Sequence, residues 1–295
     1  MAFDPGENED MASRDQFQRF LFEHSQVRGA WVQLADSYQT ITSQAPYPDS
    51  VRQLLGESLA ASVLLSSTLK FSGSLSLQAA GEGPMTTLMA ECTHNRNIRG
   101  IARFEDQAIA GEKNLHELLG QSRMAITITP EQGQRYQGVV PREADTLAGC
   151  LEEYFERSEQ IATRLFLFAD GEKAAGLLLQ RLPGHTEEDD ELWNRVEHLA
   201  ATVQAEEMLE LDSETLLHRL FHEETVRLFD PEPVAFHCSC SRERTLAALE
   251  SIGREECYSI LDEQGSIDMD CQFCHANYRF DRNDIDHLFT GHTLH

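Results

Sequence analysis

Four cysteines restrict the fold of this chain more than any other feature of its sequence. They form a C-x-C pair and a C-x₂-C pair: Cys238, Cys240, Cys271 and Cys274. Two such pairs can bring four thiolates to the corners of a tetrahedron, which is the arrangement of structural Zn²⁺ sites. The second pair has the spacing of a zinc knuckle, whereas the first is one residue shorter than usual. The sequence therefore predicts one Zn²⁺ ion per chain, held by these four cysteines.

The same spacing also favours redox chemistry. Each pair could close on itself as a disulfide under oxidation, and the short C-x-C ring would be strained. Strained disulfides are the labile and regulatory ones. From spacing alone, three interpretations stay open: a purely structural zinc knuckle, a redox-active site, or thiols that are close by chance. A Cys₃His site is a further alternative, because five histidines flank or follow the cysteines: His237, His275, His287, His292 and His295.

Charge excludes several classes of partner. The 295 residues include 50 acidic and 24 basic ones, which gives a net charge of −26. Such a charge repels phosphate backbones and anionic lipid headgroups. Even the cysteine module at residues 238–295 carries eleven acidic residues against five arginines. We therefore expect neither a nucleic acid nor a membrane as a partner.

The other cysteines and the N-terminus predict a reducing cytoplasm. Seven cysteines, an odd number, do not suit a secreted disulfide framework. We expect Cys92, in a strand pattern, and Cys150, in a helical one, to be small buried side chains, and we assign no role to Cys257. Residues 1–11 are polar and acidic, look disordered and lack the pattern of a signal peptide.

Apolar periodicity divides the chain into three parts, and the first is a sheet-rich α+β domain at residues 1–184. Strand patterns alternate with helical patterns there, and the strands from residue 74 to 104 are expected to form an antiparallel meander. The expected strands are 16–22, 27–34, 74–78, 86–92, 98–104, 124–129, 135–140, 163–168 and 174–180, and the expected helices are 34–44, 50–69 and 145–158.

The second part, residues 185–235, is expected to be a helical linker. It begins with an acidic, apolar-free run at 185–191, which we interpret as the domain boundary. Two helices with an apolar stripe and an acidic face follow. Isolated helices of this length are unstable in water, so the stripe must dock on the first domain, either permanently or conditionally. The stripe side chains are Leu192, Trp193, Val196, Leu199, Leu216, Leu220 and Phe221. The third part, residues 236–295, is the small zinc-binding domain.

Several longer motifs resemble a known family. They are RGAWVQL at 28–34, RYQG at 135–138, YFERSEQ at 154–160, GLLLQ at 176–180, FHCSCSRER at 236–244 and the CQFC motif. Together they make nearly the whole chain, except the first dozen residues, similar to the heat-shock protein 33 family of redox-regulated bacterial chaperones. No Walker-type G-x-x-x-x-G-K-[ST] motif occurs, which agrees with a chaperone that uses no nucleotide.

The resemblance implies a redox-regulated, ATP-independent holdase in the bacterial cytoplasm. It implies that the protein is inactive while zinc is bound to the reduced cysteines. Oxidation would then pair Cys238 with Cys240 and Cys271 with Cys274, release zinc and unfold a metastable linker. The active form would be a homodimer that binds unfolded or oxidatively damaged client proteins. The first domain would provide client binding and dimerisation, and the apolar linker side chains named above would contact clients.

Two hypotheses from enzyme classes remain to be weighed. A thiol-disulfide oxidoreductase using the two cysteine pairs would need a C-x-x-C motif at the start of a helix in a thioredoxin-like unit. A zinc-dependent hydrolase would need three protein ligands and an open coordination position, whereas four cysteines close the site. Neither pattern is present, so the sequence predicts a protein that is not an enzyme.

Overall fold

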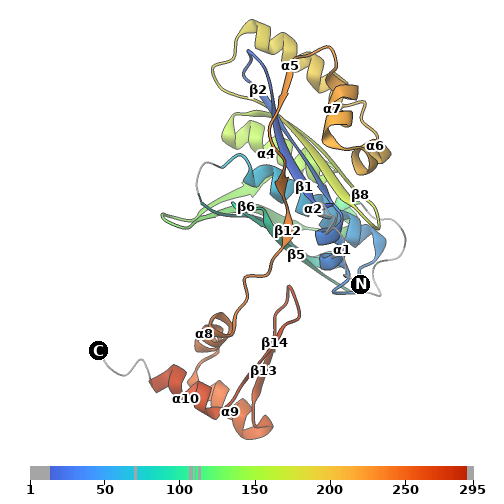
Figure 1. The fold of residues 1–295 in the computed structure, drawn as a ribbon. Helices are drawn as coiled ribbons and strands as arrows, with labels where there is room; N and C mark the ends of the chain where they lie inside the picture. The colour runs from blue at the N-terminus through green and yellow to red at the C-terminus, as the bar shows by residue number, and fades with distance from the viewer. Residues whose placement is uncertain (1–13, 70–71, 106–108, 110, 112–113, 291–295) are drawn as a thin grey trace, which may run out of the picture. The chain divides into compact units, whose positions relative to one another are not determined.

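The computed structural model describes residues 14–69, 72–105, 109, 111 and 114–290 (Figure 1). The expected disorder of residues 1–11 falls outside the described residues. Two compact units divide between Phe236 and His237. The expected linker at 185–235 belongs to the first of these units. None of the helices in the described part of the chain is long and apolar enough to cross a membrane.

Two six-stranded sheets form the framework of the first unit. The first sheet has the order β10-β1-β2-β9-β8, with β11 also paired to β1, and the second has the order β12-β5-β4-β3-β6-β7. The expected strands and the meander of β3, β4 and β5 are present. The strands are β1 (Gln16–Phe22), β2 (Val27–Leu34), β3 (Gly73–Gly81), β4 (Met85–Thr93), β5 (Asn97–Phe104), β6 (Ser122–Pro130), β7 (Tyr136–Val140), β8 (Ala162–Ala169), β9 (Ala174–Arg181), β10 (Val226–Leu228), β11 (Glu232–Pro233) and β12 (Ala235–Phe236).

A buried helix lies between the two sheets (Figure 1). This is α2 (Asp49–Ser66), and its small side chains allow both sheets to approach it closely. The hydroxyls of Ser58, Ser62 and Ser66 donate to backbone carbonyls of the same helix at 2.7, 2.7 and 2.9 Å, so they are satisfied inside an apolar core. Three further helices border this core: α1 (Asp36–Thr42), α3 (Leu115–Leu119), which the sequence did not predict, and α4 (Leu147–Tyr154), which continues as a π-helical turn, η2 (Phe155–Glu159).

Three helices cover the opposite face of the first sheet (Figure 1). They are α5 (Glu187–Ala200), α6 (Ala205–Glu210) and α7 (Ser213–Phe221). The acidic run at 185–191, interpreted from sequence as a boundary, supplies the first turns of α5. The reason is local: Thr186 caps the helix, and carboxylates are favourable beside the positive N-terminal end of a helix dipole.

The chain leaves α7 as an extended segment, residues 226–236, which we call the return strap. It pairs with β1 through β10 and β11, and then with β5 of the second sheet through β12. In Figure 1 it is the orange trace that carries the label β12. The strap therefore covers one edge of each sheet.

The second unit is a small α+β module. It contains α8 (Arg242–Ile252), α9 (Arg254–Gln264), the hairpin β13 (Ile267–Asp270) and β14 (Asn277–Phe280), and α10 (Arg282–Thr290). Its core is small, with six fully enclosed side chains: Leu249, Cys257, Leu261, Ile267, Phe280 and Ile285. A core of this size is marginal for an independent fold.

Candidate metal centre and linker interface

The four cysteines of the two pairs converge in the second unit. Their Sγ atoms all lie within 4.8 Å of one another. Cys238 Sγ is 3.6 Å from Cys271 Sγ, and Cys240 Sγ is 3.3 Å from Cys274 Sγ. Zn–S bonds of about 2.3 Å place the sulfurs of a tetrahedral site about 3.8 Å apart. The donor set and its spacing therefore fit a Zn²⁺ ion.

A tight turn positions the C-x₂-C pair. Cys271 N donates to Ala276 O at 2.9 Å, and His275 N donates to Cys271 O at 2.8 Å. His275 has a left-handed backbone with φ of 54°, which lets the chain reverse directly after Cys274. This turn joins the two strands β13 and β14. The motif therefore does not open a helix, as the redox motif of a thioredoxin-like oxidoreductase would.

Arginine contacts hold the C-x-C pair against the hairpin. Arg244 Nη1 donates to Ser239 O at 2.8 Å, between the two cysteines. Arg242 lies over the Phe280 ring at 4.6 Å from its centroid, and it donates to Arg279 O at 2.6 Å and Asp284 Oδ2 at 2.7 Å. These contacts explain why basic residues follow the motif in an acidic chain.

The surroundings of the zinc-site thiols shift their pKa values in different directions. The Tyr278 hydroxyl donates to Cys240 Sγ at 3.1 Å, and this hydrogen bond lowers the pKa of Cys240 to about 7. Burial raises the pKa of Cys238, and it raises that of Cys274 to about 12. A bound cation would hold all four as thiolates, because its charge outweighs these local effects.

The remaining cysteines and the histidines stay outside this cluster. Cys92, Cys150 and Cys257 are fully buried, which confirms the expectation for the first two. Burial raises the pKa of Cys92 to about 11, so its thiol is protonated and unreactive at neutral pH. Among the described residues, no histidine joins the metal-ligating group, and this argues against the Cys₃His alternative. His292 and His295 lie outside the described residues.

The linker helices bury most of the apolar stripe expected from the sequence. Leu192, Trp193, Val196, Leu216, Leu220 and Phe221 are buried against the outer face of the first sheet. Leu199 is 38% exposed, so its assignment to the docked face is wrong. It follows Val196 by three residues, and the 3.6-residue helical repeat carries it around to the solvent edge of the stripe.

Aromatic rings form the centre of this interface. Phe221 of α7 packs on Phe22 and Phe20 of β1, with ring centroids 5.2 and 6.3 Å apart. Gly29 of the RGAWVQL motif provides the space for Phe20, because a Cβ at Gly29 would lie 2.1 Å from the ring. Trp31 is buried beneath the same helices, and its Nε1 has no hydrogen-bond partner among the described residues. An unsatisfied buried donor costs about 1–3 kcal/mol, which weakens the docking.

Polar contacts join the linker helices to the first sheet and its turns. Asp189 accepts from Gln26 N at 2.7 Å, which ties the start of α5 to the β1–β2 turn. Gln33 Nε2 donates to Leu209 O at 2.8 Å, and Lys173 Nζ donates to the same oxygen at 3.1 Å. The ion pairs Arg164–Glu197, Arg181–Asp190 and Lys173–Glu210 add to these contacts.

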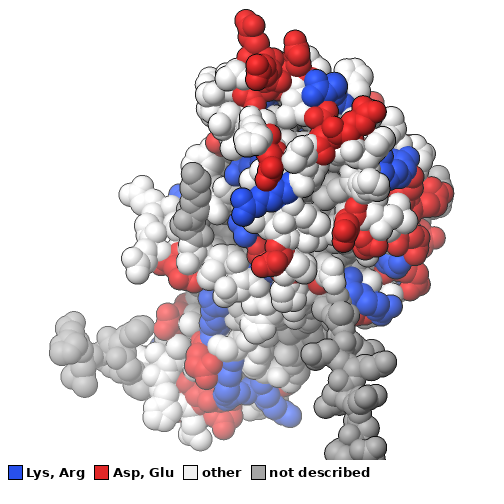
Figure 2. Space-filling view, turned by 45° about the horizontal axis from the view of Figure 1, so that its top comes forward, with Lys and Arg blue, Asp and Glu red and all other residues white. Residues whose placement is uncertain are grey.

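The outer surface of the linker is acidic. Three acidic residues of the first turn of α5 reach solvent, Glu187, Glu188 and Asp190, whereas Asp189 is buried. On the face shown in Figure 2, acidic side chains (red) gather over the upper part of the first unit, where Figure 1 places α5. The linker helices therefore have an apolar face toward the sheet and an acidic face toward solvent, where like charges repel one another.

Comparison with known proteins places this architecture in a family. The profile of the family described as Hsp33 protein matches residues 15–281. A 33 kDa chaperonin of Pseudomonas aeruginosa is 50% identical over 286 residues, which cover 95% of this chain and 96% of the relative. A 33 kDa chaperonin of Hahella chejuensis is 50% identical over 284 residues and is covered to 99%.

A solved structure shares the fold. It is the 33 kDa chaperonin (heat shock protein 33 homolog) of Thermotoga maritima, with a TM-score of 0.81, 19% identity, and coverage of 95% of this chain and 99% of the other. The chain therefore belongs to the Hsp33 family, a family of redox-regulated chaperones and not of enzymes.

Proposed function

We propose that this protein is an ATP-independent holdase whose activity is controlled by zinc and by four cysteines. In the reduced state, Cys238, Cys240, Cys271 and Cys274 hold one Zn²⁺, and the linker helices stay docked on the first sheet. In the oxidised state the cysteines form disulfides, the metal is lost and the linker undocks. The observation that carries the proposal is the convergence of four Sγ atoms within 4.8 Å in a module with a very small core.

Metal binding and folding are coupled in such a module. Structural zinc supplies about 10–16 kcal/mol of apparent binding free energy in small domains. Six enclosed side chains cannot replace a contribution of that size. Loss of the four thiolates therefore unfolds the second unit.

Oxidation removes the thiolates in pairs. A two-electron oxidant such as a peroxide takes one electron pair from each pair of thiolates and is itself reduced to water, with two protons taken up from solvent for each S–S bond formed. The Zn²⁺ leaves because its four ligands are consumed. We assign the bonds to Cys238–Cys240 and Cys271–Cys274, because a short loop closes at lower entropic cost than a long one. Reduction by a dithiol reverses the reaction.

Release of the linker gives the chaperone its binding surface. The apolar stripe of α5–α7 and the sheet face beneath it, with Phe20, Phe22 and Trp31, become accessible together. Large exposed apolar surface is what an unfolded client protein recognises. The same surface accounts for a homodimer of the active form. We place the protein in the cytoplasm, where reduced thiols are the resting state, and we assign it no nucleotide, nucleic acid or membrane partner.

An aggregation assay on the reduced and the oxidised protein tests this function. The light scattering of a heat-unfolded client should rise to the same level with the reduced, zinc-loaded protein as without it. The oxidised protein should suppress this rise without ATP. Adding dithiothreitol and zinc before the client should restore aggregation. Equal suppression by both redox forms would contradict the proposal.

A further inference from the structure

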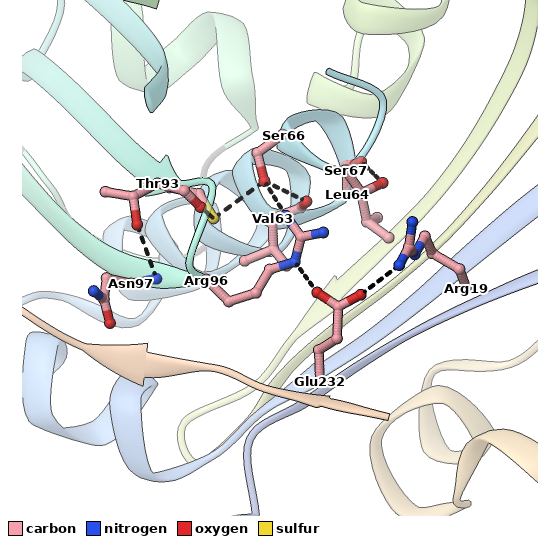
Figure 3. A network of polar contacts seen from close by, with 10 residues as sticks. Arg19, Val63, Leu64, Ser66, Ser67, Thr93, Arg96, Asn97 and Glu232 are labelled. Carbon is pink, nitrogen blue, oxygen red and sulfur yellow. Dashed lines mark hydrogen bonds and ion pairs between the residues drawn. The ribbon is translucent and has the colours of Figure 1, made fainter. Parts of the chain in front are cut away.

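A carboxylate of the return strap lies between two arginines of the sheets beneath it (Figure 3). Glu232 Oε2 accepts from Arg96 Nε at 3.0 Å, and Glu232 Oε1 accepts from Arg19 Nη2 at 2.9 Å. Arg96 belongs to the turn between β4 and β5, whereas Arg19 belongs to β1. One side chain of the strap therefore joins both sheets.

The arginine site is built to hold a carboxylate. The Arg96 side chain is only 9% exposed. Its guanidinium lies 4.3 Å from the centroid of the Phe17 ring, and its Nη1 donates to Ser66 Oγ at 3.1 Å. Arg96 has a left-handed backbone with φ of 59°, a conformation that few side chains adopt without a reason. A charge this deeply buried needs an anionic partner.

The backbone of the strap behaves as an added strand. Phe229 N donates to Arg19 O at 3.0 Å, Val234 N donates to Asp15 O at 3.1 Å, and Ala235 N donates to Arg96 O at 3.2 Å. The paired stretches are short, three residues in β10 and two each in β11 and β12. Without the strap, β1 and β5 would become the edge strands of their sheets. Open edges of this kind bind extended peptides by strand addition.

We propose that the return strap is an internal stand-in for a client, and that the site it covers takes extended client segments in the oxidised protein. The client backbone pairs with the edges of β1 and β5, and a client Asp or Glu takes the position of Glu232 between Arg19 and Arg96. An apolar residue two positions further on fills the place of Val234, which is buried in the main core. This inference rests on the proposed function, since the site opens only when the linker is released.

A synthetic peptide of residues 226–236, VRLFDPEPVAF, serves as the probe. Fluorescence anisotropy should show saturable binding of the labelled peptide to the oxidised full-length protein. The reduced protein, whose own strap occupies the site, should bind at least about tenfold more weakly. A peptide with Glu232→Gln should also lose about tenfold or more in affinity, because it loses two charge-assisted hydrogen bonds.

Matched variants separate the site from general charge effects. Arg19→Gln in the protein should weaken peptide binding, and it avoids disturbing the buried Arg96. Arg157→Gln is the control: its side chain has the same 53% exposure and pairs with Glu143, but it lies outside the strap. Glu232→Gln in the full chain should loosen the strap and let the reduced protein bind the peptide.

Two results would contradict the inference about the strap without contradicting the proposed function. One is an oxidised protein that suppresses aggregation but does not bind the peptide. The other is equal affinity for the unchanged peptide and for the peptide with Glu232→Gln. An oxidised protein that does not suppress aggregation overturns the proposed function, and the inference with it.

Discussion

At the scale of single residues, two close sulfur contacts of the zinc site join cysteines of different pairs. Cys238 lies 3.6 Å from Cys271, and Cys240 lies 3.3 Å from Cys274. The disulfides that we propose join cysteines within a pair. An S–S bond of about 2.0 Å requires the sulfurs to leave their zinc-site positions, so disulfide formation and unfolding of the module are coupled. The disulfide pattern thus reports whether cysteines of one pair or cysteines of different pairs combine.

The first prediction concerns the metal ligands. The double variant Cys271→Ser/Cys274→Ser should lose high-affinity zinc, because two of four ligands cannot complete a tetrahedral site. Metal analysis after dialysis against a chelator measures this. The double variant Cys92→Ser/Cys150→Ser, which changes two buried cysteines outside the cluster, should keep one zinc per chain. Full-affinity zinc in the first variant would refute the ligand assignment.

The second prediction concerns the disulfides. Peptide mapping of the oxidised protein should find Cys238–Cys240 and Cys271–Cys274, since shorter loops close at lower entropic cost. Oxidation with and without mild denaturant should give the same pattern. A predominance of Cys240–Cys274, whose sulfurs lie 3.3 Å apart in the folded module, would contradict the assigned pairing.

The third prediction concerns acid. The backbone N–H groups of Thr186 and Gln26 donate to Asp189 and hold the pKa of its carboxyl below the ordinary value of 3.8. Ionised Asp189 therefore favours the docked linker above about pH 4. This contribution is lost as the pH falls through the lowered value.

Asp189→Asn should remove this dependence and weaken linker docking by about 1–3 kcal/mol. The two tryptophans of the chain, Trp31 and Trp193, both lie in the linker interface, so a red shift of their emission reports undocking. Glu188→Gln, at an exposed neighbouring position, is the control. An unchanged acid transition in Asp189→Asn would contradict the assigned role.

At the scale of elements, docking of the linker on the first sheet depends on opposing free-energy contributions. Each large buried side chain contributes about 1.5–3 kcal/mol, whereas ordering the backbone costs about 1–2 kcal/mol per residue. The unsatisfied Trp31 Nε1 also opposes docking, whereas the ion pairs Arg164–Glu197 and Arg181–Asp190 favour it. A docked element of this kind is sensitive to the loss of a few contacts.

The fourth prediction follows from that sensitivity. Phe221→Ala should cost about 3–5 kcal/mol, because it removes the ring that packs on both Phe20 and Phe22. We expect the reduced variant to suppress aggregation partly and to show red-shifted tryptophan emission. Leu199→Ala, at an exposed position of α5, should behave as the wild type. A Phe221→Ala protein that stays inactive when reduced would show that linker docking does not control activity.

Sequence patterns predicted the strands and helices whose own residues show a recognisable apolar pattern. The strand β3 alternates apolar and polar residues, β9 is a short apolar run, and α2 repeats at the helical period. The short strands β10–β12 carry no such signal, because they exist only through pairing with the edges of β1 and β5. The arginine pair was missed for the same reason: Arg19 and Arg96 are far apart in sequence and meet only through Glu232.

The candidate metal site was predictable because its signal is local. Two spaced cysteine pairs are sufficient to identify four ligands, whatever the surrounding fold. The distances between the sulfurs were not predictable, nor was the hydrogen bond from Tyr278 to Cys240, since both depend on the β13–β14 hairpin.

At the scale of the whole molecule, the account links a chemical change in the second unit to the exposure of a surface in the first. The linker helices and the strap precede the second unit along the chain, and they cover the apolar sheet face and one edge of each sheet. Unfolding of the second unit removes a folded anchor from the end of the strap. We propose that the linker, whose docking is near balance, then undocks.

Hydrogen exchange of the reduced and the oxidised protein tests this link most directly. The account predicts that amides of α5, α6 and α7 lose protection on oxidation, together with those of the strap, whereas amides of the buried helix α2 keep theirs. Zinc release, measured on the same samples, shows whether the metal is lost before or after the linker amides lose protection. Linker amides that stay as protected after zinc loss as before would contradict the central claim, because the linker would then be a permanent part of the first unit.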